Sequence, residues 1–339
     1  MTNENAFEQT ANSEIAHRFI ESNGIRMHIA EQGTGPLVLL CHGFPELWYS
    51  WRYQIPALAT AGYHVVAPDQ RGYGQSDSPD DSETYTLLHL IGDMVGLLDA
   101  LGEEQAVIVG HDWGANVAWN AALLRPDRFR AVITMSVPYV PRGPVYGPRS
   151  NVRPTAAMKQ MAGDTFFYQL YFQQPGLAEA ELERDVRATM IQVLYGLSGD
   201  APEGTRWLPI RSDANASMLT GVALPASLPD WLTEADIDYY TSEYQRTGFR
   251  GGLNWYRNLD RTWELMAAYS GAKIMQPALF LWGDRDPILA IPGVKTRIER
   301  MQESVPHLRQ EVFAGAGHWL QQERAAATNE AMIAFLHGL

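Results

Sequence analysis

Short runs of apolar residues recur along the chain, and each is closed by glycine, aspartate or proline. The runs richest in Val, Ile and Leu lie at 36–43, 63–69, 105–112, 130–136 and 277–284. Continuous apolarity between turn residues is typical of strands that are buried on both faces, as in a parallel sheet. We therefore predict that these runs form the centre of one sheet.

Segments with helical periodicity alternate with these runs, at 86–102, 114–126 and 323–339. Alternating strands and helices predict an α/β fold with a mostly parallel central sheet flanked by helices. Ligands of such sheets bind at the carboxyl ends of the strands. The polar residues expected at those ends are His42, Asp69, Asp112 and Asp284.

The alternation breaks between Pro138 and Leu265. This stretch opens with closely spaced prolines and glycines, continues with helical segments such as 178–196, and shows no clear period at 198–230, which we expect to be a long loop. It resembles an inserted helical lid. The predicted parts are a mobile segment at 1–15, a first core part at 16–138, the lid at 139–265 and a second core part at 266–339.

The amino-acid composition narrows the kinds of molecule that this protein is expected to bind. The formal net charge of −13 argues against nucleic acid, because phosphate backbones are bound chiefly by clustered Lys and Arg. The lone cysteine, Cys41, ends an apolar run, so an internal disulfide is excluded and a core position is expected. We find no signal peptide and no apolar stretch of about 18 residues. We expect a cytoplasmic protein without a membrane segment, a neutral small-molecule substrate, and an assembly that can be a homodimer.

The sequence Gly-His-Asp-Trp-Gly at 110–114 joins a predicted strand to a predicted helix. Small residues on both sides of a central side chain indicate a nucleophile elbow, a sharp turn that exposes that side chain above the sheet. Its centre is Asp112, where ester and peptide hydrolases usually carry Ser. A carboxylate can displace a leaving group at an sp³ carbon and form an alkyl ester, which water must then cleave. The leaving group is therefore a halide or the oxygen of an epoxide.

An elbow nucleophile needs a base and a residue that orients the base, in the chain order nucleophile, acid, histidine. His318, in a glycine-bearing loop before the last helix, is the expected base. Asp284 and Asp286 both follow a strand. We favour Asp286 as the acid, because Asp284 directly follows Gly283 and can serve the turn.

The segment 42–46 ends a strand at the place where this arrangement supplies an oxyanion-hole donor, so we expect the backbone N–H groups of Phe44 and Trp113 to be the donors. The sequence leaves the cis or trans state of the Phe44–Pro45 bond open. His42 and His111 flank this site, but no set of His, Cys and Asp has a metal-ligand spacing. We expect them to be hydrogen-bonded turn residues, and no metal.

The two leaving groups need different assistance. A halide needs N–H donors, whereas an epoxide oxygen needs an acid that protonates it, which a pair of tyrosine hydroxyls can provide. The lid contains Tyr168, Tyr171, Tyr239, Tyr240, Tyr244 and Tyr256. Composition alone favours a core or surface position for each tyrosine, so both leaving groups stay open at this point.

Several long motifs resemble the epoxide hydrolase family of the α/β-hydrolase fold, and especially the hydrolase domain of the soluble epoxide hydrolases of animals. The resemblance extends from Ala16 to the C-terminus and is densest in HGFPELWYSWRYQIPALATAGYHVVAPDQRGYGQS, GHDWGANVAW, YQLYFQQPGLAEAELE and GFRGGLNWYRN. It implies a lidded hydrolase that converts an epoxide and water to a vicinal diol without a cofactor. The loop at 198–230 matches poorly, so no substrate preference is implied.

The resemblance also implies roles for single residues. Asp112 matches the nucleophile, His318 the base that activates water, and Asp286 the acid. Tyr168 and Tyr256 match the two lid tyrosines that polarise and protonate the epoxide oxygen. The residues that it places beside the substrate are Phe44, Trp113, Gln169 and Phe172. Related plant enzymes suggest that Glu46 organises the hydrolytic water, as an alternative to a structural role in its turn.

Two other functions remain as alternatives. A haloalkane or haloacid dehalogenase would use the same aspartate, histidine and acid. Against it, Phe44 follows the His-Gly pair where such dehalogenases often carry Asn or Glu, and both tyrosine motifs are present. A hydrolase-like fold that only binds a ligand is the third hypothesis, and the intact set of nucleophile, base, acid and tyrosines argues against it.

Overall fold

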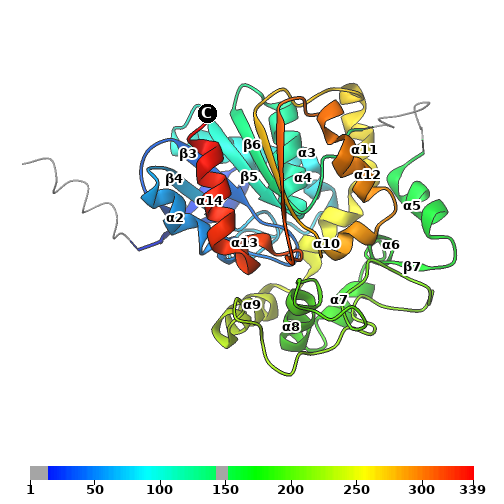
Figure 1. The fold of residues 1–339 in the computed structure, drawn as a ribbon. Helices are drawn as coiled ribbons and strands as arrows, with labels where there is room; N and C mark the ends of the chain where they lie inside the picture. Colours follow the sequence, from blue (N-terminus) through cyan, green and yellow to red (C-terminus); the bar gives the residue numbers. More distant parts are fainter. Residues whose placement is uncertain (1–13, 143–151) are drawn as a thin grey trace, which may run out of the picture.

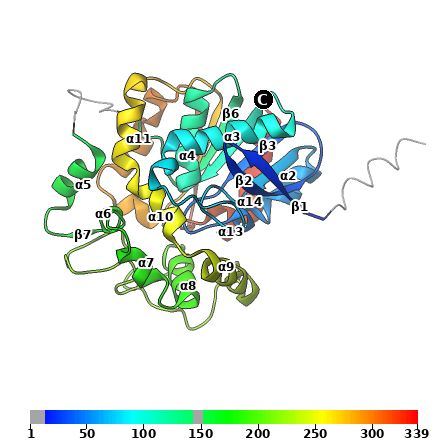
Figure 2. The same cartoon turned by 180° about the vertical axis from the view of Figure 1, so that it is seen from behind.

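The computed structural model describes residues 14–142 and 152–339. The predicted mobile segment at 1–15 lies outside the described residues except for its last two positions. The described chain forms one large sheet covered by helices, with a further group of helices beyond one end of it (Figure 1). Figure 2 shows the same arrangement from behind.

The large sheet has eight strands in the order β1-β2-β4-β3-β5-β6-β9-β10. Strand β1 pairs antiparallel with β2, and β2 pairs antiparallel with β4, whereas the remaining neighbours are parallel. The strands are β1 (Ala16–Ser22), β2 (Ile25–Gln32), β3 (Leu37–Cys41), β4 (His64–Pro68), β5 (Ala106–His111), β6 (Phe129–Met135), β9 (Ala278–Gly283) and β10 (Leu308–Phe313). Strands β3, β4, β5, β6 and β9 confirm the predicted apolar runs.

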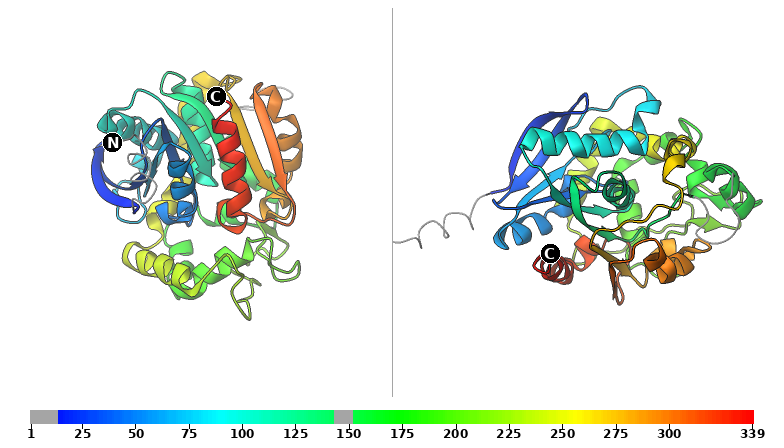
Figure 3. Two further views of the ribbon diagram at one scale, coloured as in Figure 1. Left: turned by 60° about the vertical axis from the view of Figure 1, so that its left-hand side comes forward. Right: turned by 90° about the horizontal axis from the view of Figure 1, so that it is seen from above.

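Helices bury both faces of the central strands. Successive side chains of a strand point to opposite faces. Leu39 and Ile108 therefore join the core beneath α3 and α4, while Leu40 and Val109 join the core beneath α2 and α14. Figure 3 shows α14 in red along one face of the sheet. These helices are α2 (Gln54–Thr60), α3 (Leu87–Leu101), α4 (Trp113–Leu124) and α14 (Ala325–Leu336). Two further helices, α12 (Val294–Arg300) and α13 (Leu320–Glu323), precede β10 and α14.

The second group of helices comes from the part predicted as a lid. It comprises α5 (Pro154–Ala162), α6 (Tyr168–Tyr171), α7 (Leu177–Leu182), α8 (Val186–Gly196), α9 (Glu234–Thr247), α10 (Arg250–Arg257) and α11 (Leu259–Leu265), with the two-stranded sheet β7 (Phe166–Phe167) and β8 (Ile210–Arg211). Helices α7, α8 and α9 gather beyond the sheet in Figures 1 and 2. Helix α11 lies within the predicted lid but contacts α3 of the sheet layer. The lid boundaries at 139 and 265 remain predictions.

Two helical predictions were wrong in their continuity. The segment 178–196 divides into α7 and α8 at residues 183–185, because the Asp185 side chain accepts the Ala188 N–H at 3.0 Å and begins a new helix. The segment 323–339 begins inside α13, and α14 follows from Ala325. The segment 198–230 is a loop apart from β8, as predicted. Of the helices in the described chain, none is both long and apolar enough to cross a bilayer.

Candidate active site

The turn between β5 and α4 holds Asp112 in an unusual backbone conformation, with φ 51° and ψ −117°. Few residues other than glycine adopt a positive φ. The glycines on either side leave no room for a side chain. A Cβ on Gly110 would lie 2.0 Å from the Gly114 carbonyl oxygen, and one on Gly114 would lie 2.0 Å from the Cys41 carbonyl oxygen. The small residues of the motif are therefore required for β3, β5 and α4 to approach so closely.

The loop after β3 supplies a hydrogen-bond donor to this turn. The Phe44 N–H lies 2.9 Å from Asp112 Oδ1, and the Phe44–Pro45 bond is cis. A Cβ on Gly43 would lie 2.4 Å from the Asp112 Cβ, so the loop and the elbow are in direct contact. Trp113 is the first residue of α4, and N–H groups in a first helical turn lack partners within the helix. The Phe44 N–H thus faces the Asp112 carboxylate, and the Trp113 N–H follows Asp112 directly in the chain.

The predicted base lies between two carboxylates. His318 Nδ1 is 3.0 Å from Asp286 Oδ2, and its Nε2 is 3.6 Å from Asp112 Oδ2. The other oxygen of Asp286 accepts the Ile288 N–H at 3.0 Å, which fixes the carboxylate. Asp284 is exposed, and its carboxylate accepts the Gly315 N–H at 2.7 Å. The structure therefore brings Asp286 and His318 together and leaves Asp284 in the turn.

Burial and charge act in opposite directions at this site. Burial opposes the charge of His318, but Asp286 and then Asp112 outweigh it and hold the pKa of His318 well above its usual 6.5. Burial likewise raises the pKa of Asp112, yet the hydrogen bond and the charge of His318, with the Phe44 N–H, bring it below its ordinary value. Each of the two groups therefore favours the charged form of the other.

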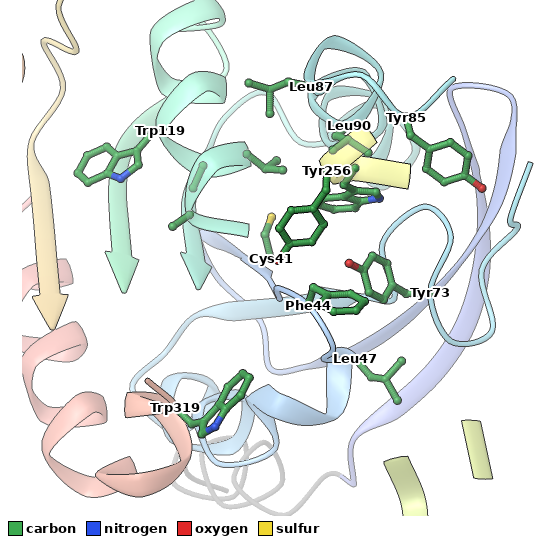
Figure 4. Packing of buried hydrophobic residues seen from close by; sticks show 14 of the residues in the cluster. Cys41, Phe44, Leu47, Tyr73, Tyr85, Leu87, Leu90, Trp119, Tyr256 and Trp319 are labelled. Atoms are coloured by element: carbon green, nitrogen blue, oxygen red, sulfur yellow. The ribbon is translucent and has the colours of Figure 1, made fainter. Parts of the chain in front are cut away.

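The two tyrosines that the resemblance selected line the same cavity as Asp112 and His318. The ring centroids of Tyr168 and Tyr256 are 6.0 Å apart. Burial, together with the charge of Asp112, raises the pKa of both hydroxyls above the ordinary value of 10. Figure 4 shows the ring of Tyr256 next to Phe44. Both hydroxyls therefore carry a proton at neutral pH and can donate it.

The other four lid tyrosines considered from the sequence lie outside the cavity lining. Tyr239 accepts a hydrogen bond from Trp48 Nε1 at 2.7 Å, and the hydroxyl of Tyr244 donates to the Glu46 carbonyl at 3.0 Å. Tyr171 bonds Glu181 and Tyr240 bonds Ser50. These tyrosines join elements to one another, so geometry separates two cavity tyrosines from four structural ones.

The cavity is mostly apolar. It is lined by Phe44, Pro45, Asp112, Tyr168, Phe172, Val193, Leu197, Trp207, Met218, Tyr256, Ile288 and His318. Phe172 is therefore part of the cavity wall. Gln169 and Trp113 are not in the lining: Gln169 Nε2 donates to the Tyr168 hydroxyl at 2.9 Å, and the Trp113 ring packs edge-on against Tyr256 at 5.1 Å. Gln169 therefore contacts the cavity residue Tyr168, and Trp113 contacts the cavity residue Tyr256.

Sequence reasoning missed several wall residues of the cavity. Val193 and Leu197 belong to the α8 region, whereas Trp207 and Met218 belong to the loop at 198–230. An apolar side chain in a loop has the same sequence signal whether it faces a ligand or the core. The only available signal was the position of the loop inside the predicted lid.

Glu46 is fully buried behind the elbow and does not line the cavity. Its Oε2 accepts the Gly43 N–H at 2.7 Å and lies 2.6 Å from His111 Nδ1. The other ring nitrogen of His111 is 2.7 Å from the carbonyl oxygen of His318. Burial raises the pKa of Glu46, but His111 outweighs burial, and the net pKa is lowered. Glu46 thus links Gly43, in the loop after β3, to the turn that carries His318, and His111 completes the connection.

The flanking histidines have protein partners at both ring nitrogens. His42 Nδ1 lies 2.9 Å from the Gly43 carbonyl oxygen, and its Nε2 accepts the Gln70 N–H at 3.1 Å. Both are hydrogen-bonded, as predicted, and His42 lies in the loop after β3, but His111 is the last residue of β5 rather than a turn residue. Within residues 14–142 and 152–339, no cluster of three or more His, Cys, Asp or Glu is arranged to hold a metal ion.

Comparison with known proteins places this site in a family. The model of the α/β hydrolase fold family matches residues 36–325. Epoxide hydrolase A of Mycobacterium tuberculosis is 49% identical over 327 residues, which cover 95% of this chain and 97% of that protein. Epoxide hydrolase 1 of Siraitia grosvenorii is 43% identical over 325 residues, which cover 95% and 98%. The crystal structure of epoxide hydrolase A from Mycobacterium thermoresistibile has a TM-score of 0.88 at 50% identity, covering 96% of this chain and 99% of that one. The chain therefore belongs to the epoxide hydrolase family of α/β hydrolases.

Proposed function

We propose that this enzyme converts small-molecule epoxides and water to vicinal diols through a covalent ester on Asp112. The observation that carries the proposal is one cavity that contains the Asp112 carboxylate, the His318 imidazole and two protonated tyrosines, Tyr168 and Tyr256. A carboxylate nucleophile suits attack on an sp³ carbon, and paired phenols suit a leaving oxygen that must be protonated.

In the first step, Asp112 Oδ2 attacks an epoxide carbon. The C–O bond of the epoxide breaks, and its electron pair stays on the epoxide oxygen. Tyr168 and Tyr256 donate hydrogen bonds to that oxygen, and one of them transfers its proton. Asp112 Oδ1, held by the Phe44 N–H, becomes the carbonyl oxygen of the ester. The product of this step is a hydroxyalkyl ester.

In the second step, water attacks the carbonyl carbon of that ester while His318 Nε2 accepts its proton. Ester formation removes the negative charge of Asp112, which is one cause of the raised pKa of His318, so the imidazole can lose its proton and act as a base. That proton restores the tyrosine that gave one up. The Phe44 and Trp113 N–H groups stabilise the tetrahedral oxyanion, and Asp286 orients His318 and offsets its charge. When the intermediate collapses, the bond between Asp112 Cγ and the alkyl oxygen breaks, and that oxygen takes the proton of the hydroxyl that water added to Cγ. The diol is released, and Asp112 is again a carboxylate.

The neighbouring residues have supporting roles in this scheme. Phe44 and Phe172 form the apolar surface beside the substrate, and Gln169 orients the Tyr168 hydroxyl. Glu46 reaches the site through Gly43 and His111, so we assign it a positioning role rather than direct contact with the water. The mostly apolar wall favours epoxides with hydrophobic substituents.

The geometry does not favour halide release. A halide needs N–H donors in the cavity, and the two indoles nearest to it have other partners. Trp207 Nε1 donates to Met218 Sδ at 3.1 Å, and the Trp113 side chain bonds Tyr256. The cavity tyrosines instead supply what an epoxide oxygen needs.

A single-turnover reaction of excess enzyme with an aryl or alkyl epoxide in oxygen-18 water tests the covalent route. The first diol is expected to carry an unlabelled oxygen from Asp112, and the label is expected in the peptide that contains Asp112, both measured by mass spectrometry. Label in the first diol would rule out the ester.

The double substitution Tyr168→Phe/Tyr256→Phe tests the assignment of the acids. It is expected to abolish epoxide opening, because no proton donor then faces the leaving oxygen, and to leave the fold intact by circular dichroism. Tyr239→Phe is the matched control, since it removes a lid hydroxyl outside the cavity lining, and it should retain turnover. Full activity in the double variant would show that other residues protonate the oxygen.

A further inference from the structure

The carboxylate of Glu323 lies directly behind the turn that carries His318. Glu323 is the last residue of α13 and is 7% exposed. Its Oε2 accepts the Gly317 N–H at 2.8 Å, and its Oε1 accepts the Trp319 N–H at 2.9 Å. The carboxylate thus holds the residues on both sides of His318, and the proposed mechanism has not used it.

The same carboxylate reaches a second segment, which follows α8. Its Oε2 also accepts the Gly199 N–H at 2.9 Å. The His318 N–H donates to the Leu197 carbonyl oxygen at 3.0 Å, so two hydrogen bonds join the histidine turn to residues 197–199. This segment is part of the cavity wall, because Leu197 lines the cavity.

The backbones of the two segments are in contact. A Cβ on Gly317 would lie 2.2 Å from the Gly199 nitrogen, and one on Gly199 would lie 2.1 Å from the Gly315 carbonyl oxygen. Glycine at these positions lets the chains meet, but it provides no side chain to hold them. The three hydrogen bonds of Glu323 supply that attachment, and hydrogen bonds to a charged acceptor are stronger than neutral ones.

Burying the Glu323 carboxylate costs free energy, which its hydrogen bonds must offset. Burial raises the pKa of Glu323 above its ordinary value, and the backbone N–H groups of Gly317, Gly199 and Trp319 offset only part of this rise. A neutral side chain could not replace these bonds. Glutamine would keep one acceptor oxygen and turn an NH2 group toward backbone N–H donors, which would leave buried donors unpaired.

We propose that Glu323 is a positioning residue that fixes the His318 turn against the end of α8 and thereby serves the hydrolysis of the Asp112 ester rather than its formation. The proposal rests on the proposed function, because it assigns Glu323 to one of the two steps. The Asp112 carboxylate is held in position by its elbow and by the Phe44 N–H, in addition to the charge of His318. Only the second step needs His318 as a base aimed at a water molecule.

The test is Glu323→Gln, with the two steps measured separately by rapid quench and mass spectrometry of the protein. Ester formation is expected to stay close to the wild-type rate. Ester hydrolysis should fall by about 10-fold or more, as expected for a small displacement of a catalytic group. The ester should therefore accumulate, and kcat and KM should fall together.

Glu181→Gln is the matched control. The Glu181 carboxylate also holds a lid segment through backbone N–H groups, those of Met218 and Leu219 at 3.0 Å, but it does not touch the His318 turn. It should lower stability without making the ester accumulate. Glu323→Asp keeps the charge and shortens the side chain, so it provides a second test if the glutamine variant does not fold, with the same selective loss expected.

The outcomes distinguish this proposal from the proposed function. Equal slowing of both steps, no slowing of either, or failure of both Glu323 variants to fold would overturn the positioning role. If the wild-type enzyme turns over an epoxide and never forms the ester, the covalent mechanism itself is wrong. A wild-type ester with selective accumulation in Glu323→Gln supports both.

Discussion

The imidazole of His318 lies between two carboxylates, and in the proposed mechanism Asp286 keeps its charge whereas Asp112 loses its charge in the ester. Burial opposes the imidazolium, whereas Asp286 and Asp112 raise its pKa. When Asp112 is esterified, only Asp286 still raises the pKa of His318. In the proposed mechanism, the charge of Asp112 would therefore control the protonation of His318, and the imidazole would become available as a base only after the ester has formed.

Asp286→Asn tests this view of the site. Removing the remaining negative charge should lower the pKa of His318 in the ester, so the acid limb of ester hydrolysis should move to lower pH. The plateau rate should also fall, by about 100-fold or more, because the imidazole loses the group that orients it. Single-turnover hydrolysis measured between about pH 5 and pH 9 gives both quantities.

Asp284→Asn is the control for that substitution. It changes a neighbouring aspartate whose carboxylate serves only the Gly315 turn bond, so its pH profile should match that of the wild-type enzyme. An acid limb that stays in place in Asp286→Asn would show that Asp286 does not set the pKa of His318.

The residues of the site differ in how far the sequence identifies them. Asp112 and His318 are predictable because the elbow and the chain order impose a pattern on their neighbours. Tyr168 and Tyr256 depend on the resemblance, because tyrosines elsewhere in the lid bond other elements instead. Glu323 was hidden in a predicted helix, and nothing in its neighbours indicates that its carboxylate accepts three backbone N–H groups.

At the scale of elements, the turn from β5 to α4 is the most constrained feature. Gly114→Ala would place a Cβ 2.0 Å from the Cys41 carbonyl oxygen, and a backbone atom cannot move aside as a flexible side chain can. We expect a loss of at least about 2 kcal/mol in the free energy of unfolding, with a loss of activity, because β3 and α4 must separate. Urea unfolding measures the first quantity.

The matched substitution is Gly204→Ala, because a Cβ on Gly204 would meet no atom within 4 Å. It should leave the free energy of unfolding almost unchanged. Similar destabilisation in the two variants would mean that the close contact at the elbow does not determine the requirement for glycine.

The strands that sequence analysis missed are those near the edges of the sheet. Most residues of β1 are exposed, and β10 has a single buried residue, Leu308. A strand with water on one side lacks the continuous apolar run that identified β3 and β5, which are buried throughout. The pattern therefore predicts the buried centre of the sheet and says little about its margins.

At the scale of the whole molecule, the site combines residues from distant parts of the chain. Asp112 lies before the predicted lid, Tyr168 lies within it, and His318 lies after it. The boundary between lid and core therefore has to hold its position. The chain order of these parts was predictable, but their relative placement was not, because it depends on side-chain contacts such as Trp48–Tyr239, for which no local pattern exists.

One buried ion pair lies at this boundary. Arg52 Nε is 3.0 Å from the carboxylate of Asp236 in α9, and the two side chains are 9% and 5% exposed. Arg52 also donates to Gln322 in α13 at 2.7 Å. It therefore joins α9, which lies within the predicted lid, to α13, which follows the lid in the chain. Arg52→Met would leave the Asp236 carboxylate buried without its cation, which should lower the free energy of unfolding by about 3 kcal/mol.

Arg187→Met provides the comparison, because Arg187 in α8 pairs with the exposed carboxylates of Glu234 and Asp238 in α9, the helix that also carries Asp236. Its cost should stay below about 1 kcal/mol, since water screens an exposed pair. Urea unfolding followed by tryptophan fluorescence measures both variants. Epoxide turnover at the same urea concentrations should decline at lower urea in Arg52→Met, because the tyrosines of the lid must stay above Asp112 for the reaction. Equal losses in the two variants would show that the buried pair does not hold the lid to the core.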